Sequence, residues 1–217
     1  MEKALIKGYI AKRVAKEFKD GDFVNLGIGL PTMVPAYLPE DVHVILQAEV
    51  GMAGQGGKPE VADPNVVDAG GQPSSIAPGG AFIDSATSFG LIRGGHVNAT
   101  VLGALEVDQE GNLANWIIPG KKVPGMGGGM DLVAGANQVI VTMEHCTKTG
   151  EPKILKHCTL PLTAAHEVDY IVTELCVLHY NGDGLVLEEL APGVTVEDVL
   201  SKTEAELIIP DEIRCMV

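Results

Sequence analysis

One carboxylate, that of Glu49, directly follows an apolar segment and precedes a loop with few large side chains. The segment 43–48 reads HVILQA, and the loop 50–57 reads VGMAGQGG. A carboxylate at the end of a buried strand can lose part of its solvation and act as a nucleophile. The glycines let a bulky substrate approach the backbone, whose amides can stabilise an oxyanion. The alternative is a solvated loop glutamate, because most charged side chains are simply exposed.

A second glycine cluster, residues 125–130 with the sequence GMGGGM, precedes a short helix that we expect to begin at Asp131. Backbone N–H groups in such a loop can hold an anion or an oxyanion. The alternative is a tight turn with close packing.

Residues 27–29, GIG, resemble part of a dinucleotide fingerprint. The third glycine is missing and Leu30-Pro31 follows, so we do not expect NAD binding.

Histidine and cysteine occur together twice, at His145-Cys146 and at His157-Cys158. These are the residue types that zinc prefers, but their spacing matches no known finger pattern. We therefore expect structural residues here and no metal site.

No serine or cysteine lies near the other histidines in a way that suggests a catalytic triad. Lys121-Lys122 is the strongest local positive charge, either a solvated turn or a contact for a phosphate or a partner carboxylate.

Apolar segments and turn signals alternate along the chain and predict an α/β fold with an open, mainly parallel sheet flanked by helices. The expected strands are 23–26, 43–48, 100–107, 138–143, 169–173 and 175–179, and the expected helices are 2–18, 31–37, 84–93, 196–201 and one from Asp131. Residues 50–57 are expected to be a loop and residues 78–80 a turn. The length and the absence of repeats or linkers predict a single domain, 1–217. Such sheets bind ligands at the carboxyl ends of their strands, where Glu49 is expected.

The chain carries 29 acidic and 15 basic residues, a net charge of −14. Nucleic acids and anionic membranes are therefore unexpected partners, because both are bound largely through positive charge. The N-terminal sequence has charges throughout and does not read as a signal peptide. No apolar run approaches the roughly 20 residues that span a bilayer. We expect a cytoplasmic protein whose four cysteines are free thiols, with a secreted disulfide protein as the alternative.

Taken together, the motifs resemble those of the B (β) subunit of family I CoA-transferases, the acetoacetate, butyrate, 3-oxoadipate and succinate:3-oxoacid group. The resemblance covers essentially the whole chain. It rests on residues 27–31 (GIGLP), 49–51 (EVG), 78–80 (PGG), 92–96 (IRGGH), 112–116 (NLANW), 119–132 (PGKKVPGMGGGMDL), 144–148 (EHCTK) and 160–162 (LPL).

The resemblance implies the CoA-transferase fold, which sugar-phosphate isomerases share, and a transferase of the EC 2.8.3 type. It implies that Glu49 attacks an acyl-CoA in a ping-pong cycle and becomes a glutamyl-CoA thioester. Gly128 matches the position whose backbone amide faces the nucleophile, and Gly51, Gly127 and Gly129 are the other residues expected to bind substrate or CoA. Coenzyme A is then a substrate, and no permanently bound cofactor or metal is expected.

The resemblance also implies a separate A subunit, commonly in an A2B2 heterotetramer, with short-chain acyl-CoA or 3-oxoacyl-CoA and carboxylate substrates. The negative charge fits this expectation, because the chain alone is poorly suited to hold the phosphates of CoA. One position departs from the family, which usually has Asn after the nucleophile where this chain has Val50. Valine cannot hydrogen-bond near the carboxylate, which puts the substrate preference in doubt. The alternatives are an acyl-CoA hydrolase of the same fold and a non-catalytic ligand-binding module.

Overall fold

The computed structural model describes residues 3–120 and 125–216. Within them, eleven strands form one sheet in the order β13-β12-β11-β10-β8-β5-β1-β2-β3-β4, with β14 beside β12. The strands are β1 Phe23–Leu26, β2 Ile45–Ala48, β3 Met52–Gln55, β4 Ile76–Phe82, β5 Ala99–Gly103, β8 Val139–Thr142, β10 Tyr170–Val172, β11 Cys176–Tyr180, β12 Leu185–Leu190, β13 Leu207–Ile208 and β14 Arg214–Cys215. A small second sheet contains β7 Leu113–Ala114, β6 Glu106–Asp108 and β9 Ile154–Leu155, in that order.

The centre of the large sheet is parallel and its flanks are mixed. Strands β2, β1, β5, β8 and β10 are parallel neighbours. The pairs β2–β3, β3–β4, β10–β11 and β11–β12 are antiparallel. The prediction of an α/β fold with an open, mainly parallel sheet is therefore confirmed for the part of the sheet that carries Glu49.

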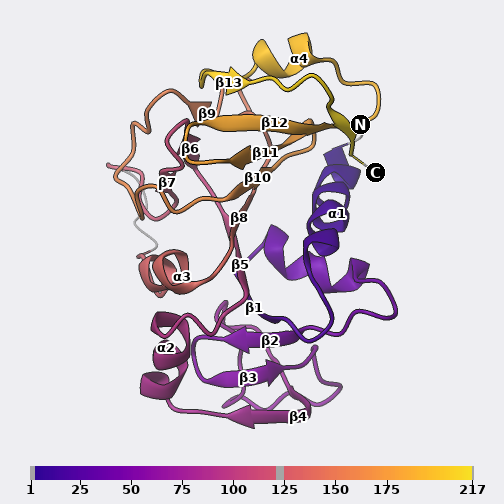
Figure 1. Cartoon of the computed structure of the whole chain (residues 1–217). Coiled ribbons are helices and arrows are strands. Elements are labelled where there is room, and N and C mark those ends of the chain that lie inside the picture. The colour runs from indigo at the N-terminus through magenta and orange to yellow at the C-terminus, as the bar shows by residue number, and fades with distance from the viewer. Residues whose placement is uncertain (1–2, 121–124, 217) are drawn as a thin grey trace.

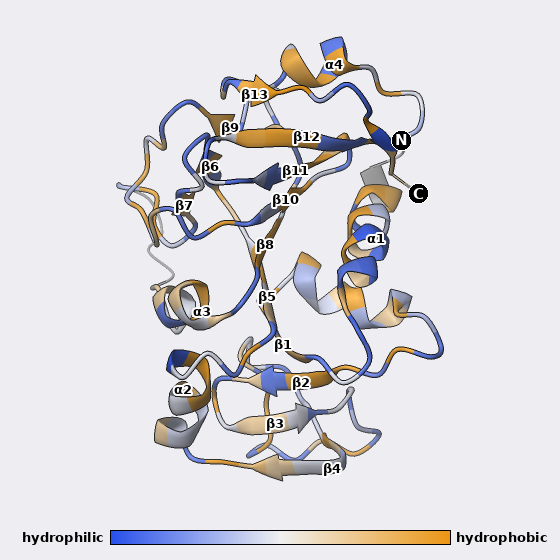
Figure 2. Cartoon of the chain, viewed as in Figure 1, coloured by the Kyte–Doolittle hydropathy of each residue, from blue (hydrophilic) through white to orange (hydrophobic). Residues whose placement is uncertain are grey.

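Helices cover both faces of the central strands (Figure 1). One face carries α2 Ser85–Arg93 and α3 Gly129–Gly135, and the other carries α1 Lys3–Val14 and the 3-10 helix η2 Leu30–Tyr37; the short helices η1 Ala15–Glu17 and α4 Val196–Leu200 complete the set. Successive strand residues point to opposite faces. Val101 and Ile140 accordingly join the core beside α1, while Leu102 and Val141 join the core beside α2 and α3. Burial on both faces explains why β5 and β8 are coloured mainly as hydrophobic in Figure 2.

Three local predictions were wrong. The expected loop 50–57 contains strand β3, and the expected turn 78–80 lies within strand β4. Glycines allow these two strands to pair closely, because a Cβ on Gly54 would lie only 2.7 Å from the Cα of Gly80. The expected strand 100–107 is divided, since β5 ends at Gly103 and β6 belongs to the second sheet.

The two ends of the chain are tied together on one side of the sheet (Figure 1). Arg13 of α1 donates two hydrogen bonds to Glu189 of β12, at 2.6 and 2.9 Å, and both side chains are buried. Tyr9 donates its hydroxyl proton to the carbonyl oxygen of Met216. Removing one partner of a buried ion pair leaves an uncompensated charge, so this contact fixes α1 against the sheet. In the described residues, none of the helices has the length and apolar character needed to cross a membrane.

A fully buried histidine holds the loop after β8 in place. The two ring nitrogens of His145 lie 3.0 Å from Thr173 Oγ1 and 2.9 Å from Thr203 Oγ1. Each hydroxyl also contacts a backbone carbonyl oxygen, that of Val199 for Thr203 and that of Cys176 for Thr173. The two contacts hold the imidazole ring between the segments that follow β10 and α4. Burial, followed by the positive charges of Lys202 and Lys153, lowers the pKa of His145 from 6.5 to about 4.

We predict that His145 makes the protein less stable in mild acid. As the pH falls below 6.5, the unfolded chain binds a proton on His145 before the folded chain does. Its stabilising contribution is complete above pH 6.5 and is lost as the pH falls towards about 4, by about 3 kcal/mol in all. Urea unfolding across this range should show a weaker pH dependence for His145→Gln. The exposed His157→Gln is the control, and equal pH dependence in His145→Gln and the unchanged protein would contradict the prediction.

Candidate functional site

Glu49 lies in the turn that directly follows β2, at the carboxyl edge of the parallel strands. Its half-buried side chain lines a cavity of about 460 Å³. The other walls come from the carboxyl ends of β1 and β5, from residues 115–116 and from the glycine cluster before α3. Segments far apart in the sequence therefore meet at the edge where parallel sheets bind ligands.

The glycine cluster approaches Glu49 at Gly128. A Cβ built on Gly128 would lie 3.4 Å from Cγ of Glu49 and 3.3 Å from the ring of Phe89. Any side chain at this position would thus occupy the space beside the carboxylate. Among the described residues, the N–H of Gly128 has no hydrogen-bond acceptor. The backbone itself forms the wall of the cavity next to Glu49, and no described residue uses the N–H donor of Gly128 there.

A chain of buried amides leads from α2 to the carboxylate. Asn25 Nδ2 lies 3.2 Å from Glu49 Oε2 and donates at 2.7 Å to Gln47 Oε1. Gln47 Nε2 in turn donates to Ser88 Oγ at 2.8 Å. Asn25, Gln47 and Ser88 are all buried. The contacts fix the orientation of both amides, and Asn25 then presents an N–H to one oxygen of the carboxylate.

Two contacts between α2 and α3 set the position of the glycine cluster. Arg93 Nε donates to Asp131 Oδ1 at 2.7 Å across the two helices. At the other end of α3, a Cβ on Gly135 would collide with the backbone of Ile92. The helices thus approach to backbone contact, and Phe89 of α2 lies against Gly128. Because α3 begins at Gly129, this packing also determines where Gly128 meets Glu49.

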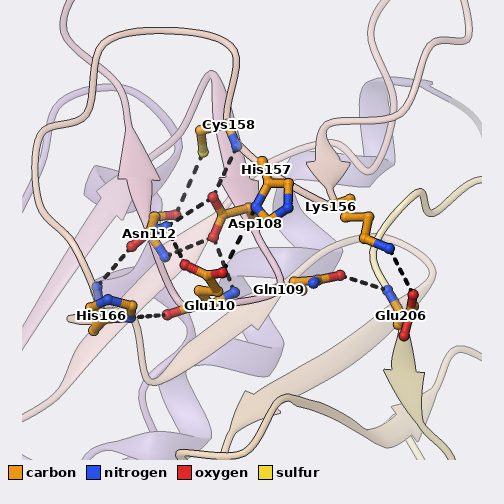
Figure 3. A network of polar contacts seen from close by, with 9 residues as sticks. All are labelled: Asp108, Gln109, Glu110, Asn112, Lys156, His157, Cys158, His166 and Glu206. Carbon is orange, nitrogen blue, oxygen red and sulfur yellow. Dashed lines mark hydrogen bonds and ion pairs between the residues drawn. The ribbon is translucent and has the colours of Figure 1, made fainter.

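Polar contacts between two loops hold the part of the cavity wall that Gly103 and Asn115 form. Thr163 Oγ1 donates to Asn115 Oδ1 at 2.6 Å, and Asn115 Nδ2 donates to the carbonyl oxygen of Gly103. Both Asn115 and Gly103 line the cavity. Further from the cavity, buried Asp108 accepts four N–H groups, two from Asn112 and one each from the backbone of Glu110 and Cys158 (Figure 3). These bonds join the turn between β6 and β7 to the segment that carries Thr163.

The structure brings most of the expected site residues together. Gly127, Gly128 and Gly129 line the same cavity as Glu49. Gly51 does not line it, and a Cβ on Gly51 would lie 2.5 Å from the carbonyl oxygen of Ile83. Its positive φ of 132° and this close approach give Gly51 a role in joining β2, β3 and β4.

Two other expected features lie outside the cavity. The side chain of Val50 is 54% exposed and is not part of the cavity wall, and the amide contact to Glu49 comes from Asn25 instead. Lys121-Lys122 falls outside the described residues. The two cysteines of the His-Cys pairs contact different backbone carbonyl oxygens. Cys146 Sγ contacts that of Lys202, and Cys158 Sγ contacts that of Asn112. Over residues 3–120 and 125–216, no group of three or more His, Cys, Asp and Glu side chains gathers as metal ligands would.

Asn25, Gln47 and Asn115 are site residues that the sequence analysis did not single out. Asn25 and Gln47 are paired in register on neighbouring strands. Their signal was present in the sequence as one polar residue within each of two apolar strands, FVNL and ILQA. A buried amide in a strand that is covered on both faces needs a partner, and so indicates a polar network.

Comparison with known proteins identifies the family. Residues 7–202 match the family model described as Coenzyme A transferase. The β subunit of acetate CoA-transferase from Haemophilus influenzae is 58% identical over 97% of this chain and 95% of the relative. That from Escherichia coli K12 is 55% identical over 96% of each chain.

A solved acyl-CoA transferase from Escherichia coli O157:H7 has the same fold, with a TM-score of 0.78 at 23% identity. The match covers 98% of this chain but only 43% of that longer one. The matched family model, the two close relatives and the fold agree with one another. The chain belongs to the coenzyme A transferase family, as a β subunit of the family I type.

Proposed function

We propose that this chain transfers coenzyme A between a short-chain acyl-CoA or 3-oxoacyl-CoA and a free carboxylic acid, with Glu49 as nucleophile and together with an A subunit. The supporting observation is the close approach of the Gly128 backbone to Glu49 inside a cavity at the carboxyl edge of the sheet. On this proposal residues 1–217 act as one cytoplasmic domain, coenzyme A is a substrate, and no permanent cofactor takes part.

The first half of the cycle loads CoA onto the protein. A carboxylate oxygen of Glu49 attacks the thioester carbonyl carbon, the carbon–sulfur bond breaks, and CoA leaves as a thiolate. The product on the protein is an acyl-glutamyl anhydride. The thiolate then attacks the glutamyl carbonyl carbon, which releases the first acid as a carboxylate and leaves a glutamyl-CoA thioester.

The second half reverses these steps with a different acid. The acceptor carboxylate attacks the glutamyl thioester, forms a new anhydride and displaces the CoA thiolate. The thiolate attacks the acyl carbon of that anhydride, which gives the new acyl-CoA and the free Glu49 carboxylate. One thioester is consumed and one is formed over the full cycle, so the exchange needs no ATP and no net proton transfer.

One backbone group and one side-chain group can stabilise the negative charges that arise in this cycle. Each attack places negative charge on a carbonyl oxygen, and the N–H of Gly128, which has no acceptor among the described residues, can stabilise that oxyanion. The amide of Asn25 donates towards one oxygen of Glu49 at 3.2 Å. The other oxygen remains available for attack. Glycine at position 128 is required because a side chain would fill the space that the substrate carbonyl must enter.

The charge distribution supports a partner subunit. Glu49 is the only charged residue among the described residues that line the cavity, and its charge is negative. With a net charge of −14, the chain repels the phosphates of CoA. We therefore propose that an A subunit supplies much of the CoA site, in an A2B2 assembly whose active site lies between the subunits.

Glu49→Gln should abolish the covalent step, because a neutral amide is a poor nucleophile. Intact-mass measurement of the assembled enzyme after incubation with acetyl-CoA should show a CoA-sized adduct on the peptide that contains Glu49. The Glu49→Gln enzyme should show none, and Glu49→Asp should react far more slowly because the attack geometry is demanding. The exposed Glu40→Gln serves as the control. Ligand binding with an unmodified peptide would favour a non-catalytic module, and CoA release without an added acid would favour a hydrolase.

Gly128→Ala should lower kcat about a hundredfold, since a displacement of the reacting groups by about 1 Å has an effect of that size. The new methyl group would press on both Phe89 and Glu49. Gly90→Ala is a matched control on α2, where a Cβ meets nothing within 4 Å. Steady-state kinetics and thermal unfolding should be measured together. Unchanged kcat in a folded Gly128→Ala enzyme would argue against a backbone donor at this position.

The chain alone should have little transferase activity, because most of the CoA-binding charge would come from the partner. Transfer should be assayed with each purified subunit separately and with the two mixed. The mixture should be active, and a mixture that contains Glu49→Gln should be inactive. Full activity of this chain without its partner would contradict the shared active site.

A further inference from the structure

Three buried polar side chains lie in a row across neighbouring strands of the large sheet. Gln47 of β2, Asn25 of β1 and Thr100 of β5 are paired in register, so their side chains lie on the same face. Because Gln47 contacts Ser88 of α2, this is the face that α2 and α3 cover. All three side chains are buried in strands that are otherwise apolar. Asn25 and Gln47 are linked to Glu49, whereas Thr100 Oγ1 has no hydrogen-bond partner among the described residues.

The polar atoms of the Asn25 amide are used unequally. Its Nδ2 lies within 3.2 Å of three acceptors, which are Oε1 and the carbonyl oxygen of Gln47 and Oε2 of Glu49. Its Oδ1 is buried, and no described residue donates to it. A buried acceptor without a partner lowers stability. The opposite orientation would place Oδ1 against oxygens of both Gln47 and Glu49, so the orientation of Asn25 is set by these two neighbours.

Gln47 holds the Asn25 amide by the shortest of these contacts. Its Oε1 accepts from Asn25 Nδ2 at 2.7 Å, and its Nε2 donates to Ser88 Oγ at 2.8 Å. An amide has one end that donates and one that accepts, so the bond to Ser88 determines which end of Gln47 faces Asn25. Neither Gln47 nor Ser88 lines the cavity that contains Glu49. An effect of these two side chains on the carboxylate therefore passes through Asn25.

We propose that Gln47 is a positioning residue that acts on Glu49 through Asn25 and is itself oriented by Ser88. The inference rests on the proposed function, because it takes Glu49 as the nucleophile. With Gln47 in place, the N–H of Asn25 faces one oxygen of Glu49 and stabilises negative charge on it. Without Gln47, the amide of Asn25 is free to turn, and its Oδ1 would then face the same oxygen and repel it. The polar network thus selects one of two amide orientations.

Gln47→Met removes both polar atoms at nearly constant side-chain length. In the assembled two-subunit enzyme it should lower kcat and kcat/KM for acetyl-CoA together, by about tenfold or more, because an oriented hydrogen bond to a charged group is lost. Ser88→Ala should have a smaller effect of the same kind, since Gln47 keeps its bond to Asn25. Thr100→Val is the matched control, because it changes the unpartnered hydroxyl of the same row, and it should leave kcat unchanged.

Thermal unfolding of each variant shows whether a loss of activity comes from a loss of the fold. Unchanged kcat in a folded Gln47→Met enzyme would overturn the proposal. If Gln47→Met does not fold, unchanged kcat in Ser88→Ala would overturn it instead.

A double-mutant cycle separates a positioning role from a structural one. In an Asn25→Ala enzyme the amide that Gln47 orients is gone, so adding Gln47→Met should lower kcat by less than about twofold further. Effects that multiply would mean that Gln47 acts independently of Asn25, which would overturn the proposal. Where turnover is slow, the same comparison uses the single-turnover rate of the CoA-sized adduct with acetyl-CoA, followed by intact mass. Absence of that adduct in the unchanged enzyme would instead refute the proposed function.

Discussion

The site depends on the approach of a bare backbone to a carboxylate. Glu49 and Gly128 lie beside each other in the cavity wall, and a methyl group added to Gly128 would be 3.4 Å from Glu49 Cγ. The distance between the end of β2 and the start of α3 therefore sets the space beside the carboxylate. A hydrogen-bond donor that belongs to the backbone cannot rotate away as a side chain can. The geometry is thus as rigid as the packing of the two elements that carry it.

That packing is itself set by glycine and by buried polar groups. The collision that any side chain at Gly135 would make with Ile92 shows that α2 and α3 meet through their backbones, and Arg93 joins α2 to Asp131 near the start of α3. On the sheet side, Asn25 and Gln47 lie in register on β1 and β2 and link Glu49 to Ser88 of α2. The helix α2 therefore contacts both the strand that carries Glu49 and the glycine cluster. A change in its position would move the two cavity walls together.

Much of this arrangement could be predicted from the sequence, for physical reasons. Buried parallel strands such as VIVT of β8 are mainly apolar, so their positions were evident, and the helix expected over residues 84–93 is observed as α2. The strands β3 and β4 were missed because Gly54 and Gly80 read as turn signals, yet both are needed for close pairing at the sheet edge. Gly51 was assigned to the substrate site by resemblance, but its neighbour across the sheet is Ile83. Short-range patterns do not reveal which distant segment a glycine must approach.

The proposed ping-pong cycle would place a further demand on the site. Between the half-reactions, CoA remains attached to Glu49 while one acid leaves and another enters. If the acid and CoA occupied the same channel, the bound thioester would block the exchange. The cavity that contains Glu49 adjoins a second cavity beside Ala48 and Leu46, and the two share Leu26, Ile28 and Ala69. A second route to Glu49 of this kind would let the acids exchange while CoA stays in place. Ile28 and Ala69, which belong to the shared wall, are both exposed in this chain.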